Sequence, residues 1–208
     1  MNYYVDFDGT LYNTQLLKEQ MLVCLAKSVH SQNKKLKSGD LLAEAVSLFC
    51  REKIYDIFDL CEYFAKKYNV QNQVLKSNIN DLLKNGKKFV FKDSVKFLDK
   101  LKKEGHTIVL LTYCAQKTTK FQERKVAGSG LVDYFDKIII TQEPKYQLKN
   151  IDYKNGIFID DNPNDLLGLS KNNPIELVRI KREDNKYSKM PLEDVQVKEI
   201  ETFKELSL

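Results

Sequence analysis

Residues 2–10 read NYYVDFDGT, and this stretch decides how the rest of the chain is interpreted. Its first half is rich in tyrosine and valine, which favour a short buried strand, and Gly9-Thr10 is typical of the turn that follows one. Asp6 and Asp8 lie two residues apart, and alternate residues of a strand point to the same side of a sheet. The stretch therefore predicts a short strand over residues 2–8, whose carboxyl end carries two acidic side chains.

Apolar runs of strand type return after residue 88, and segments with helical periodicity alternate with them. The runs are HTIVLLT (106–112), KIIIT (137–141), GIFID (156–160) and IELVRIK (175–181). Helices are expected from Asp93 or Ser94 to Lys103, over about 117–127 and over 162–170. Continuous apolar strands that alternate with helices are typical of a parallel sheet covered on both faces. The expected fold class is therefore α/β, with a doubly wound, Rossmann-like parallel sheet.

A long stretch between the first and second strands has helical periodicity instead. Its apolar faces fall into separate segments, lined for example by Leu17 and Met21, Leu41 and Ala45, Ile57 and Phe64, and Leu75 and Ile79. Polar, turn-like residues separate these segments. We therefore expect two domains: an α/β core formed by residues 1–13 and 88–208, and a small all-helical domain formed by residues 14–87.

The composition is that of an ordinary globular protein. The chain has 208 residues, of which 42% are hydrophobic and 30% are charged, and these proportions exclude a largely disordered protein. No apolar run approaches the roughly 20 residues that a membrane helix needs. Asp6 and Asp8 also lie where a secretory signal peptide requires an apolar core, so we expect a cytoplasmic protein without a membrane partner.

The net charge of +5 comes from the helical segment. Residues 14–88 hold the excess of Lys and Arg over Asp and Glu, while the rest of the chain is balanced. A basic segment can attract nucleic acid. Here, however, the lysines alternate with acidic residues along the helices, which is typical of a solvated surface. A nucleic-acid partner is therefore not expected.

Ligands of an open parallel sheet bind at the carboxyl ends of its strands. The side chains expected at that edge are Asp6 and Asp8 from the first strand, Thr112 from the second, Lys145 after the third, and Asp160, Asp161 and Asp165 from the fourth strand and the helix behind it. Several carboxylates at one place repel one another unless a cation lies among them. Oxygen ligands with room for water suit Mg²⁺.

These residues resemble the four motifs of the haloacid dehalogenase (HAD) superfamily. DFDGT (6–10) is similar to the first motif, LLT (110–112) to the second, a lysine after the third strand to the third, and DDNPND (160–165) to the fourth. The resemblance covers residues 1–13 and 88–208. The helical insertion resembles, by its position and helix content, the cap domain that such enzymes carry between motifs one and two.

The resemblance also implies a role for each candidate catalytic residue. Asp6 would attack phosphorus and form an aspartyl-phosphate, and Asp8 would protonate the leaving oxygen and then deprotonate water. Thr112 would donate a hydrogen bond to a phosphoryl oxygen. A lysine would offset negative charge beside Asp6. Lys145 is nearest to the third strand, and Lys149 is the alternative.

Mg²⁺ is the cofactor that the resemblance implies. Its ligands would come from Asp6, from the carbonyl of Asp8 and from the fourth motif. Asp161 is favoured there over Asp160, because the residue directly after the strand is the commoner metal ligand in similar enzymes. Asp165 would bind the ion through water or anchor the lysine.

We therefore expect a Mg²⁺-dependent phosphohydrolase that acts on a small phosphorylated metabolite. A phosphotransferase or phosphomutase would use the same residues with a substrate hydroxyl in place of water, and the sequence does not separate the two. A third interpretation is a non-catalytic HAD-like module that binds a partner, and the intact set of acidic residues argues against it. Nothing in the sequence predicts the oligomeric state.

Overall fold

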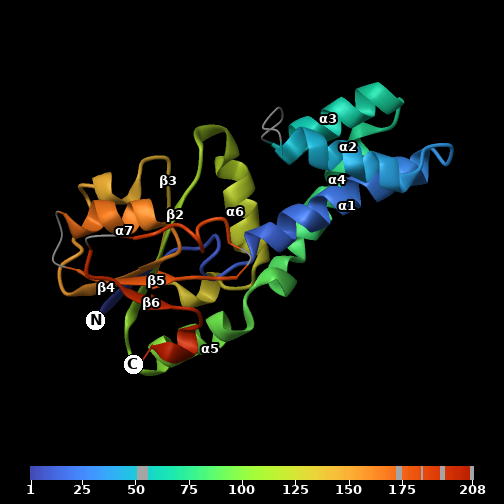
Figure 1. Ribbon diagram of the computed structural model, residues 1–208. Coiled ribbons are helices and arrows are strands. Elements are labelled where there is room, and N and C mark those ends of the chain that lie inside the picture. Colours follow the sequence, from blue (N-terminus) through green and yellow to red (C-terminus); the bar gives the residue numbers. More distant parts are fainter. Residues whose placement is uncertain (51–55, 172–174, 184, 193–194, 207–208) are drawn as a thin grey trace. The chain divides into compact units, whose positions relative to one another are not determined.

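The structure is a computed structural model that describes residues 1–50, 56–171, 175–183, 185–192 and 195–206 (Figure 1). The chain divides into two compact units. The first consists of Met1–Gln15 and Lys87–Leu208, and the second of Leu16–Gly86. The first unit contains a sheet with its helices, whereas the described residues of the second unit form helices and their connections.

A parallel sheet of six strands forms the centre of the first unit. The strands are β1 (Asn2–Val5), β2 (Thr107–Tyr113), β3 (Lys137–Thr141), β4 (Gly156–Asp160), β5 (Glu176–Ile180) and β6 (Lys198–Ile200). They lie in the order β3-β2-β1-β4-β5-β6, so the chain winds outward from β1 in both directions. The doubly wound α/β sheet predicted from the sequence is confirmed. The winding direction reverses between β1 and β4, and their carboxyl ends therefore flank the crevice where such sheets bind ligands.

The register of the central strands aligns two of the predicted site residues. Val5 lies opposite Leu110 of β2 and opposite Ile159 of β4. Asp6 and Asp160 are the next residues after this last pair, and the Asp6 amide donates a hydrogen bond of 2.9 Å to the carbonyl oxygen of Ile159. The two acidic side chains therefore leave the sheet next to each other.

Helices cover the sheet, and the described residues of the first unit contain α5 (Lys92–Lys103), α6 (Thr119–Gly128) and α7 (Pro163–Ser170). Figure 1 shows α5 and α7 on opposite sides of the sheet. The 3-10 helices are η1 (Gly86–Phe89), η2 (Gln116–Thr118), η3 (Val132–Tyr134), η4 (Lys145–Gln147) and η5 (Phe203–Glu205). Phe97 of α5 stacks on Phe203 of η5 with ring centres 4.2 Å apart. This contact packs η5 against one of the helices that cover the sheet.

Three details differ from the sequence prediction. The first strand ends at Val5 rather than at residue 8, because the carbonyl oxygen of Phe7 already accepts hydrogen bonds from amides of the following turn. Neither Asp93 nor Ser94 caps α5 through its side chain, and Asp93 accepts hydrogen bonds from the guanidinium of Arg182 instead. The strand β6 is not predicted, because three residues carry too little pattern to be recognised.

The second unit is helical, as its apolar periodicity predicts. Its helices are α1 (Thr14–Gln32), which begins in the first unit, α2 (Ser38–Cys50), α3 (Ile57–Tyr68) and α4 (Asn72–Lys84). The predicted apolar faces are buried, including Leu17, Met21, Leu41, Ala45, Ile57, Phe64, Leu75 and Ile79. Across the described ranges, no helix has both the length and the apolar composition of a membrane span. The role of this unit as a cap stays a prediction from the resemblance.

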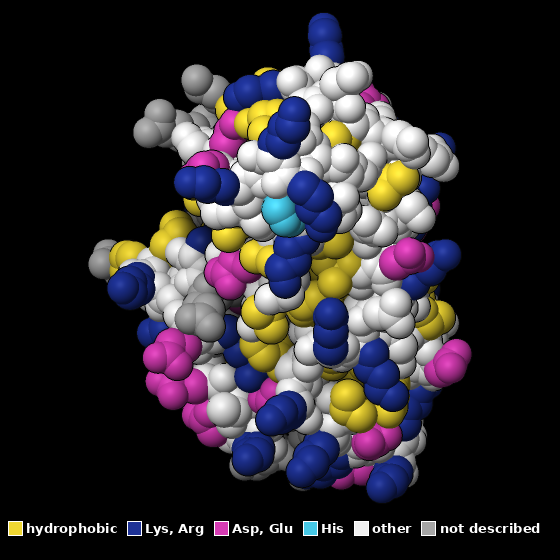
Figure 2. Space-filling model, turned by 90° about the vertical axis from the view of Figure 1, so that its right-hand side faces the viewer, with side chains coloured by type: hydrophobic (Ala, Val, Ile, Leu, Met, Phe, Trp, Pro, Cys, Tyr) yellow, Lys and Arg dark blue, Asp and Glu magenta, His cyan; other side chains and the backbone are white. Residues whose placement is uncertain are grey.

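Positive charge is dispersed on the face of the molecule that Figure 2 shows. Lys and Arg side chains are scattered there among acidic and hydrophobic side chains, without gathering in one patch. This arrangement fits the alternation of lysines with acidic residues along the sequence. The absence of a nucleic-acid partner stays a prediction.

Candidate active site

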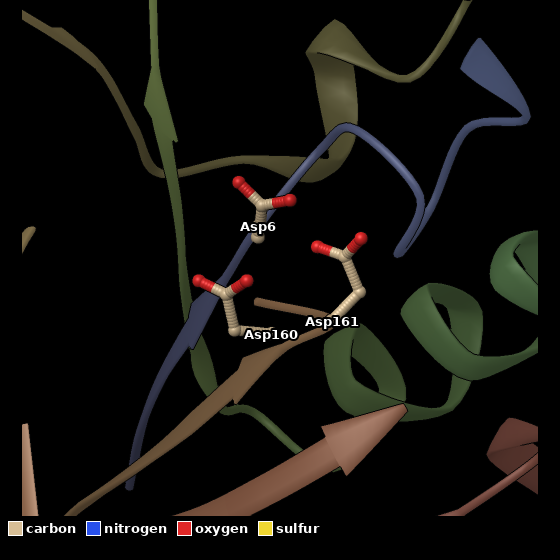
Figure 3. Close-up of side chains that lie close together, drawn as sticks. All are labelled: Asp6, Asp160 and Asp161. Atoms are coloured by element: carbon tan, nitrogen blue, oxygen red, sulfur yellow. The ribbon is translucent and has the colours of Figure 1, made fainter. Parts of the chain in front are cut away.

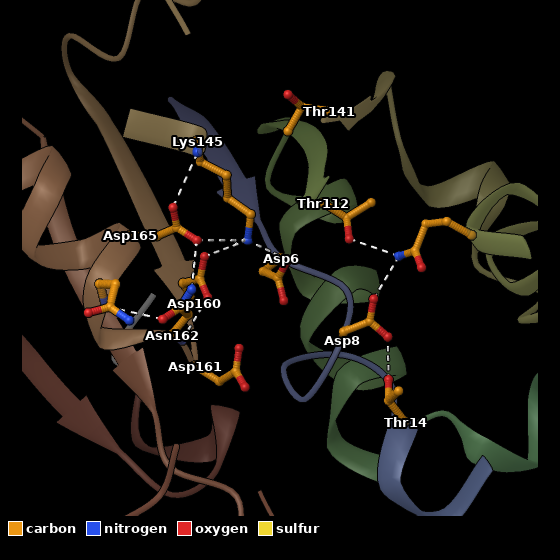
Figure 4. A network of polar contacts seen from close by, with 12 residues as sticks. Asp6, Asp8, Thr14, Thr112, Thr141, Lys145, Asp160, Asp161, Asn162 and Asp165 are labelled. Atoms are coloured by element: carbon orange, nitrogen blue, oxygen red, sulfur yellow. Dashed lines mark hydrogen bonds and ion pairs between the residues drawn. The ribbon is translucent and has the colours of Figure 1, made fainter. Parts of the chain in front are cut away.

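Lys145 lies among carboxylates at the carboxyl end of the sheet (Figure 4). Its Nζ is 2.5 Å from Oδ1 of Asp6, 2.6 Å from Oδ2 of Asp160 and 4.0 Å from Oδ2 of Asp165. The lysine side chain is only 3% exposed. Burial alone would lower the pKa of this ammonium, but the charges of Asp160, Asp6 and Asp165 outweigh it and raise the pKa. Lys145 is therefore a permanent buried cation.

The chain presents Lys145 through a short turn rather than from a helix. Pro144 precedes η4, and the hydroxyl of Tyr153 donates a hydrogen bond of 2.8 Å to the carbonyl oxygen of Lys145. The backbone amide of Lys145 donates to Oδ1 of Asp165 at 3.2 Å. Lys149, the alternative lysine, is exposed. The segment between β3 and β4 therefore places Lys145 at the carboxylates and leaves Lys149 in solvent.

Asp6, Asp160 and Asp161 form a compact group of three carboxylates (Figure 3). One carboxylate oxygen from each lies within 4.8 Å of the others, and all three residues are buried. Burial raises the pKa of Asp6 to about 8, although Lys145 opposes the shift. Burial, together with the charge of Asp6, raises the pKa of Asp161 to about 7. The group is therefore short of positive charge, and a further cation among its oxygens would favour its ionised form.

Asp160 and Asp161 have different partners, although they are adjacent in sequence. Asp160 ends β4, and its carboxylate accepts hydrogen bonds from Lys145 and, at 2.8 Å, from the backbone amide of Asn162. Asp161 follows the strand, and its carboxylate accepts a hydrogen bond from the neutral side chain of Asn185. Among the described residues, Lys145 forms ion pairs with other carboxylates but not with that of Asp161. The charge of Asp161 is therefore not offset by direct contact with the Lys145 ammonium group.

Asp165 lies in the first turn of α7 and holds the lysine segment in place. Its Oδ1 accepts the backbone amide of Lys145, and its Oδ2 accepts the side-chain amide of Asn162 at 3.0 Å. In the part of the chain that the structure describes, it does not belong to the group of three carboxylates. The sequence predicts that Asp165 either binds the metal ion through water or anchors the lysine. Its contacts support the role of an anchor for Lys145.

Asp8 has its own set of hydrogen-bond donors (Figure 4). Its Oδ1 accepts hydrogen bonds from the Thr14 hydroxyl and the Lys125 ammonium, and its Oδ2 accepts one of 2.7 Å from Gln122. Burial alone would raise the pKa of Asp8, but the charge of Lys125 and these hydrogen bonds lower it. Gln122 also donates to Oγ1 of Thr112 at 2.9 Å. Because that oxygen accepts, the Thr112 hydroxyl can give its own hydrogen to another oxygen.

The predicted site residues thus fall into two sets at one end of the sheet. The first set surrounds Lys145 and comprises Asp6, Asp160, Asp161 and Asp165, and the second comprises Asp8 and Thr112. A carboxylate beside a buried lysine, a second carboxylate held in its ionised form and a hydroxyl donor are groups that suit the transfer of an anionic group.

Solved structures of one family align with nearly the whole chain. A HAD phosphatase from Thermococcus onnurineus covers 98% of this chain and 94% of its own, with 20% identity and a TM-score of 0.63. YfnB from Bacillus subtilis, in a crystal form bound to magnesium, covers 98% and 95%, with 14% identity and a TM-score of 0.60. This chain has the HAD-like hydrolase fold.

A third structure with the HAD-like fold is a mutant of CbbY from Rhodobacter sphaeroides in complex with xylulose-(1,5)bisphosphate. It covers 99% of this chain and 96% of its own, with 13% identity and a TM-score of 0.58. No protein-family model and no curated protein matches the sequence. The HAD-like fold predicted from the four motifs is confirmed, while the chemistry depends on the residues of this chain.

Four residues that contact the candidate site are not predicted from the sequence. They are Thr14, Gln122 and Lys125, which contact Asp8, and Asn185, which contacts Asp161. A signal for two of them exists. The buried positions of α6 include Gln122, Lys125 and Val126, so this helix has too few apolar residues to build its buried face from them alone. Asn185 follows β5 in a segment without periodicity, and nothing in the sequence marks it.

Gly9 of the DFDGT stretch allows the close approach of Asp161. Its φ is +76°, which L residues rarely adopt, and a Cβ added there would overlap the side chains of Asp161 and Asn185. We expect Gly9→Ala to lower the free energy of unfolding by about 1–3 kcal/mol, measured by chemical denaturation.

Gly39→Ala is the matched control, because an added Cβ at Gly39 meets no described atom within 4 Å. Its stability should equal or slightly exceed that of the wild type. Equal losses of stability in the two alanine variants would contradict the close approach at Gly9.

Proposed function

We propose that this chain is a Mg²⁺-dependent phosphohydrolase that cleaves a small phosphomonoester through an aspartyl-phosphate intermediate. The observation that carries the proposal is the position of Asp6. Its carboxylate is hydrogen-bonded to the buried Lys145 and also belongs to the acidic group with Asp160 and Asp161. Asp8, two residues further on, is held by different donors. Two carboxylates with separate environments suit separate roles in one reaction.

Mg²⁺ fits the group of three carboxylates. Their oxygens lie close enough to share one ion, and oxygen ligands are those that Mg²⁺ prefers. Burial raises the pKa values of Asp6 and Asp161, and a cation among the oxygens would favour the ionised forms. Asp6 and Asp161 would be the main side-chain ligands, together with the Asp8 carbonyl, as the resemblance implies. When bound, Mg²⁺ would neutralise charge on the phosphoryl group and orient it. The magnesium-bound crystal form of YfnB, which shares the fold, supports this choice.

Each catalytic residue then has a step. Asp6 would attack phosphorus, so that a bond from phosphorus to the carboxylate forms as the bond to the leaving oxygen breaks. Asp8, whose side chain is partly exposed, would take up a proton from solvent and give it to the leaving oxygen. It would afterwards take one from the water that attacks the intermediate and releases Asp6. Lys145 and Thr112 would stabilise the phosphoryl oxygens by charge and by a hydrogen bond. The lowered pKa of Asp8 suits the second proton transfer, in which an ionised carboxylate is needed.

A phosphorylated small molecule is the substrate class that we propose. The acidic group and its ion would bind the phosphoryl part, which every phosphomonoester shares. CbbY, which has the same fold, binds a bisphosphorylated sugar, and this supports a phosphorylated metabolite as the substrate here.

The direct test is hydrolysis of 4-nitrophenyl phosphate by the purified protein. We expect turnover with Mg²⁺, loss of turnover when EDTA is in excess, and recovery when Mg²⁺ is added back, because the acidic group cannot bind a dianionic ester without a cation. Turnover that persists at full rate in excess EDTA would contradict a metal-dependent reaction.

The stabilisation of the protein by Mg²⁺ should increase with pH. The folded, metal-free protein keeps a proton on Asp6 up to a pKa of about 8, whereas an ordinary aspartate loses it near 3.9. The raised pKa therefore makes the metal-free fold less stable as pH rises between these values. Mg²⁺ would bind the ionised carboxylates and displace their protons, so its affinity should rise over the same interval.

A thermal unfolding series checks this prediction. At about 100 times the dissociation constant at pH 8.5, Mg²⁺ should raise the midpoint by roughly 5–10 °C, and the same concentration should have a much smaller effect at pH 5.5. KCl at equal ionic strength is the control for a general effect of salt. An equal rise at both pH values would mean that the ion does not bind the buried carboxylates.

A further inference from the structure

Two polar side chains of α6, Gln122 and Lys125, are buried at the site. They lie three residues apart and hence on one face of the helix, and they are 4% and 3% exposed. Moving an ammonium group out of water costs free energy unless a partner compensates it. Lys120 on the same helix is exposed and needs no such partner. The burial of Lys125 therefore indicates a role inside the molecule.

The partner of Lys125 is Asp8. The lysine Nζ donates to Oδ1 of Asp8 and lies 5.7 Å from the centre of the Phe7 ring. The Thr14 hydroxyl donates to the same oxygen, and Gln122 donates to the other one. Because both oxygens are engaged, the carboxylate cannot rotate about its Cβ–Cγ bond without breaking hydrogen bonds. The Asp8 side chain is nevertheless 30% exposed, so it stays accessible.

Gln122 connects Asp8 with Thr112. Its Nε2 is 2.7 Å from Oδ2 of Asp8 and 2.9 Å from Oγ1 of Thr112. One amide group therefore fixes the separation between a carboxylate that follows β1 and a hydroxyl near the end of β2. In the proposed reaction the carboxylate acts on the leaving oxygen and the hydroxyl on a phosphoryl oxygen, and both oxygens belong to one phosphorus atom.

We propose that Lys125 and Gln122 are positioning residues of phosphoryl transfer, which hold Asp8 where it meets the leaving oxygen. This inference rests on the proposed function. A positioning role acts on the proton transfer alone, whereas a structural role affects all substrates alike. A strongly basic leaving group depends on that proton more than a weakly basic one does. Loss of positioning should therefore be selective for the leaving group.

The test compares phenyl phosphate with 4-nitrophenyl phosphate, which share the aryl phosphate group and whose leaving groups differ in basicity. The quantity is kcat/KM, because it includes the step in which the leaving group departs. Lys125→Met should lower kcat/KM by roughly 100-fold for phenyl phosphate and by less than about 10-fold for 4-nitrophenyl phosphate. Gln122→Met should shift the ratio in the same direction. Lys120→Met, the matched control on the same helix, should leave the ratio unchanged.

Lys125→Arg retains the charge and the donors, and it should recover most of the wild-type ratio. An unchanged ratio in Lys125→Met and Gln122→Met proteins would overturn the positioning role, whether or not both rates fall. If circular dichroism shows that Lys125→Met does not fold, Gln122→Met, which removes no charge, decides the question. A wild-type protein that hydrolyses neither ester, or an Asp6→Asn protein that hydrolyses both normally, would overturn the proposed function instead.

Discussion

Asp6→Asn is expected to abolish the hydrolysis of phosphomonoesters, with kcat falling by roughly 10⁴-fold or more. The substitution keeps the size of the side chain but replaces the attacking carboxylate by a neutral amide, which is a poor nucleophile. It also relieves repulsion, because burial and the charges of Asp160 and Asp8 raise the pKa of Asp6. Lys145 keeps Asp160 and Asp165 as partners. The variant should therefore fold, with a thermal midpoint without Mg²⁺ close to that of the wild type.

Asp133→Asn is the matched control, because Asp133 lies on η3 with its side chain exposed. It should leave kcat and the thermal midpoint unchanged. Acid quenching during turnover of a radiolabelled phosphomonoester should leave label on the wild type and on the Asp133→Asn protein, but none on the Asp6→Asn protein. An Asp6→Asn protein that keeps more than about a tenth of the activity would contradict nucleophilic attack by this residue.

Much of the fold and the place of the candidate site follow from the sequence because they depend on local pattern. Apolar runs that alternate with helical segments require a parallel sheet, and a parallel sheet brings the carboxyl ends of its strands to one edge. Residues that directly follow a strand, such as Asp6 and Asp161, are then placed by the chain itself. The register of Val5 with Ile159 brings their neighbours together.

The partners of the site residues do not follow from the sequence, because they depend on the rotation of helices and on loops. Lys120 and Lys125 are the same residue type on one helix, yet only Lys125 is buried, and it reaches a carboxylate more than 100 residues away. Asn185 contacts Asp161 from a segment without periodicity. Such contacts form between elements, and only the three-dimensional arrangement reveals them.

The sequence alone does not decide between Lys145 and Lys149, because this choice also depends on contacts between elements. Both lysines follow β3 closely in sequence, and no local pattern marks either of them as a site residue. The anchor from Asp165 to the backbone amide of Lys145 and the hydrogen bond from Tyr153 to its carbonyl oxygen fix the turn so that Lys145 points at the carboxylates. Both anchors lie outside the turn, so the turn's own sequence does not contain the answer.

Lys145→Met is expected to lower both activity and stability. Methionine fills a similar volume but removes the only cation that forms ion pairs with Asp6, Asp160 and Asp165 among the described residues. Breaking a buried ion pair from one side leaves uncompensated charge, which costs about 3–5 kcal/mol of the free energy of unfolding. Loss of a positive group beside the phosphoryl oxygens should lower kcat by roughly 10²–10³-fold.

The pH dependence separates this loss of charge from a simple loss of packing. Without Lys145, the pKa values of Asp6 and Asp160 should rise further, because the lysine lowers both of them in the wild type. These carboxyl groups then bind protons as pH falls, so the stability difference between variant and wild type should be smaller at pH 5.5 than at pH 8. A difference that does not change with pH would indicate packing alone.

Lys149→Met is the matched control for Lys145→Met, since Lys149 carries the same side chain four residues away and is exposed. Lys149→Met should leave kcat unchanged. It should change the free energy of unfolding by no more than about 0.5 kcal/mol. If Lys149→Met abolished turnover while Lys145→Met did not, Lys145 would not be the lysine that stabilises the phosphoryl oxygens. If both variants kept full activity, the negative charge at phosphorus would have to be balanced by the metal ion and by hydrogen bonds without a lysine.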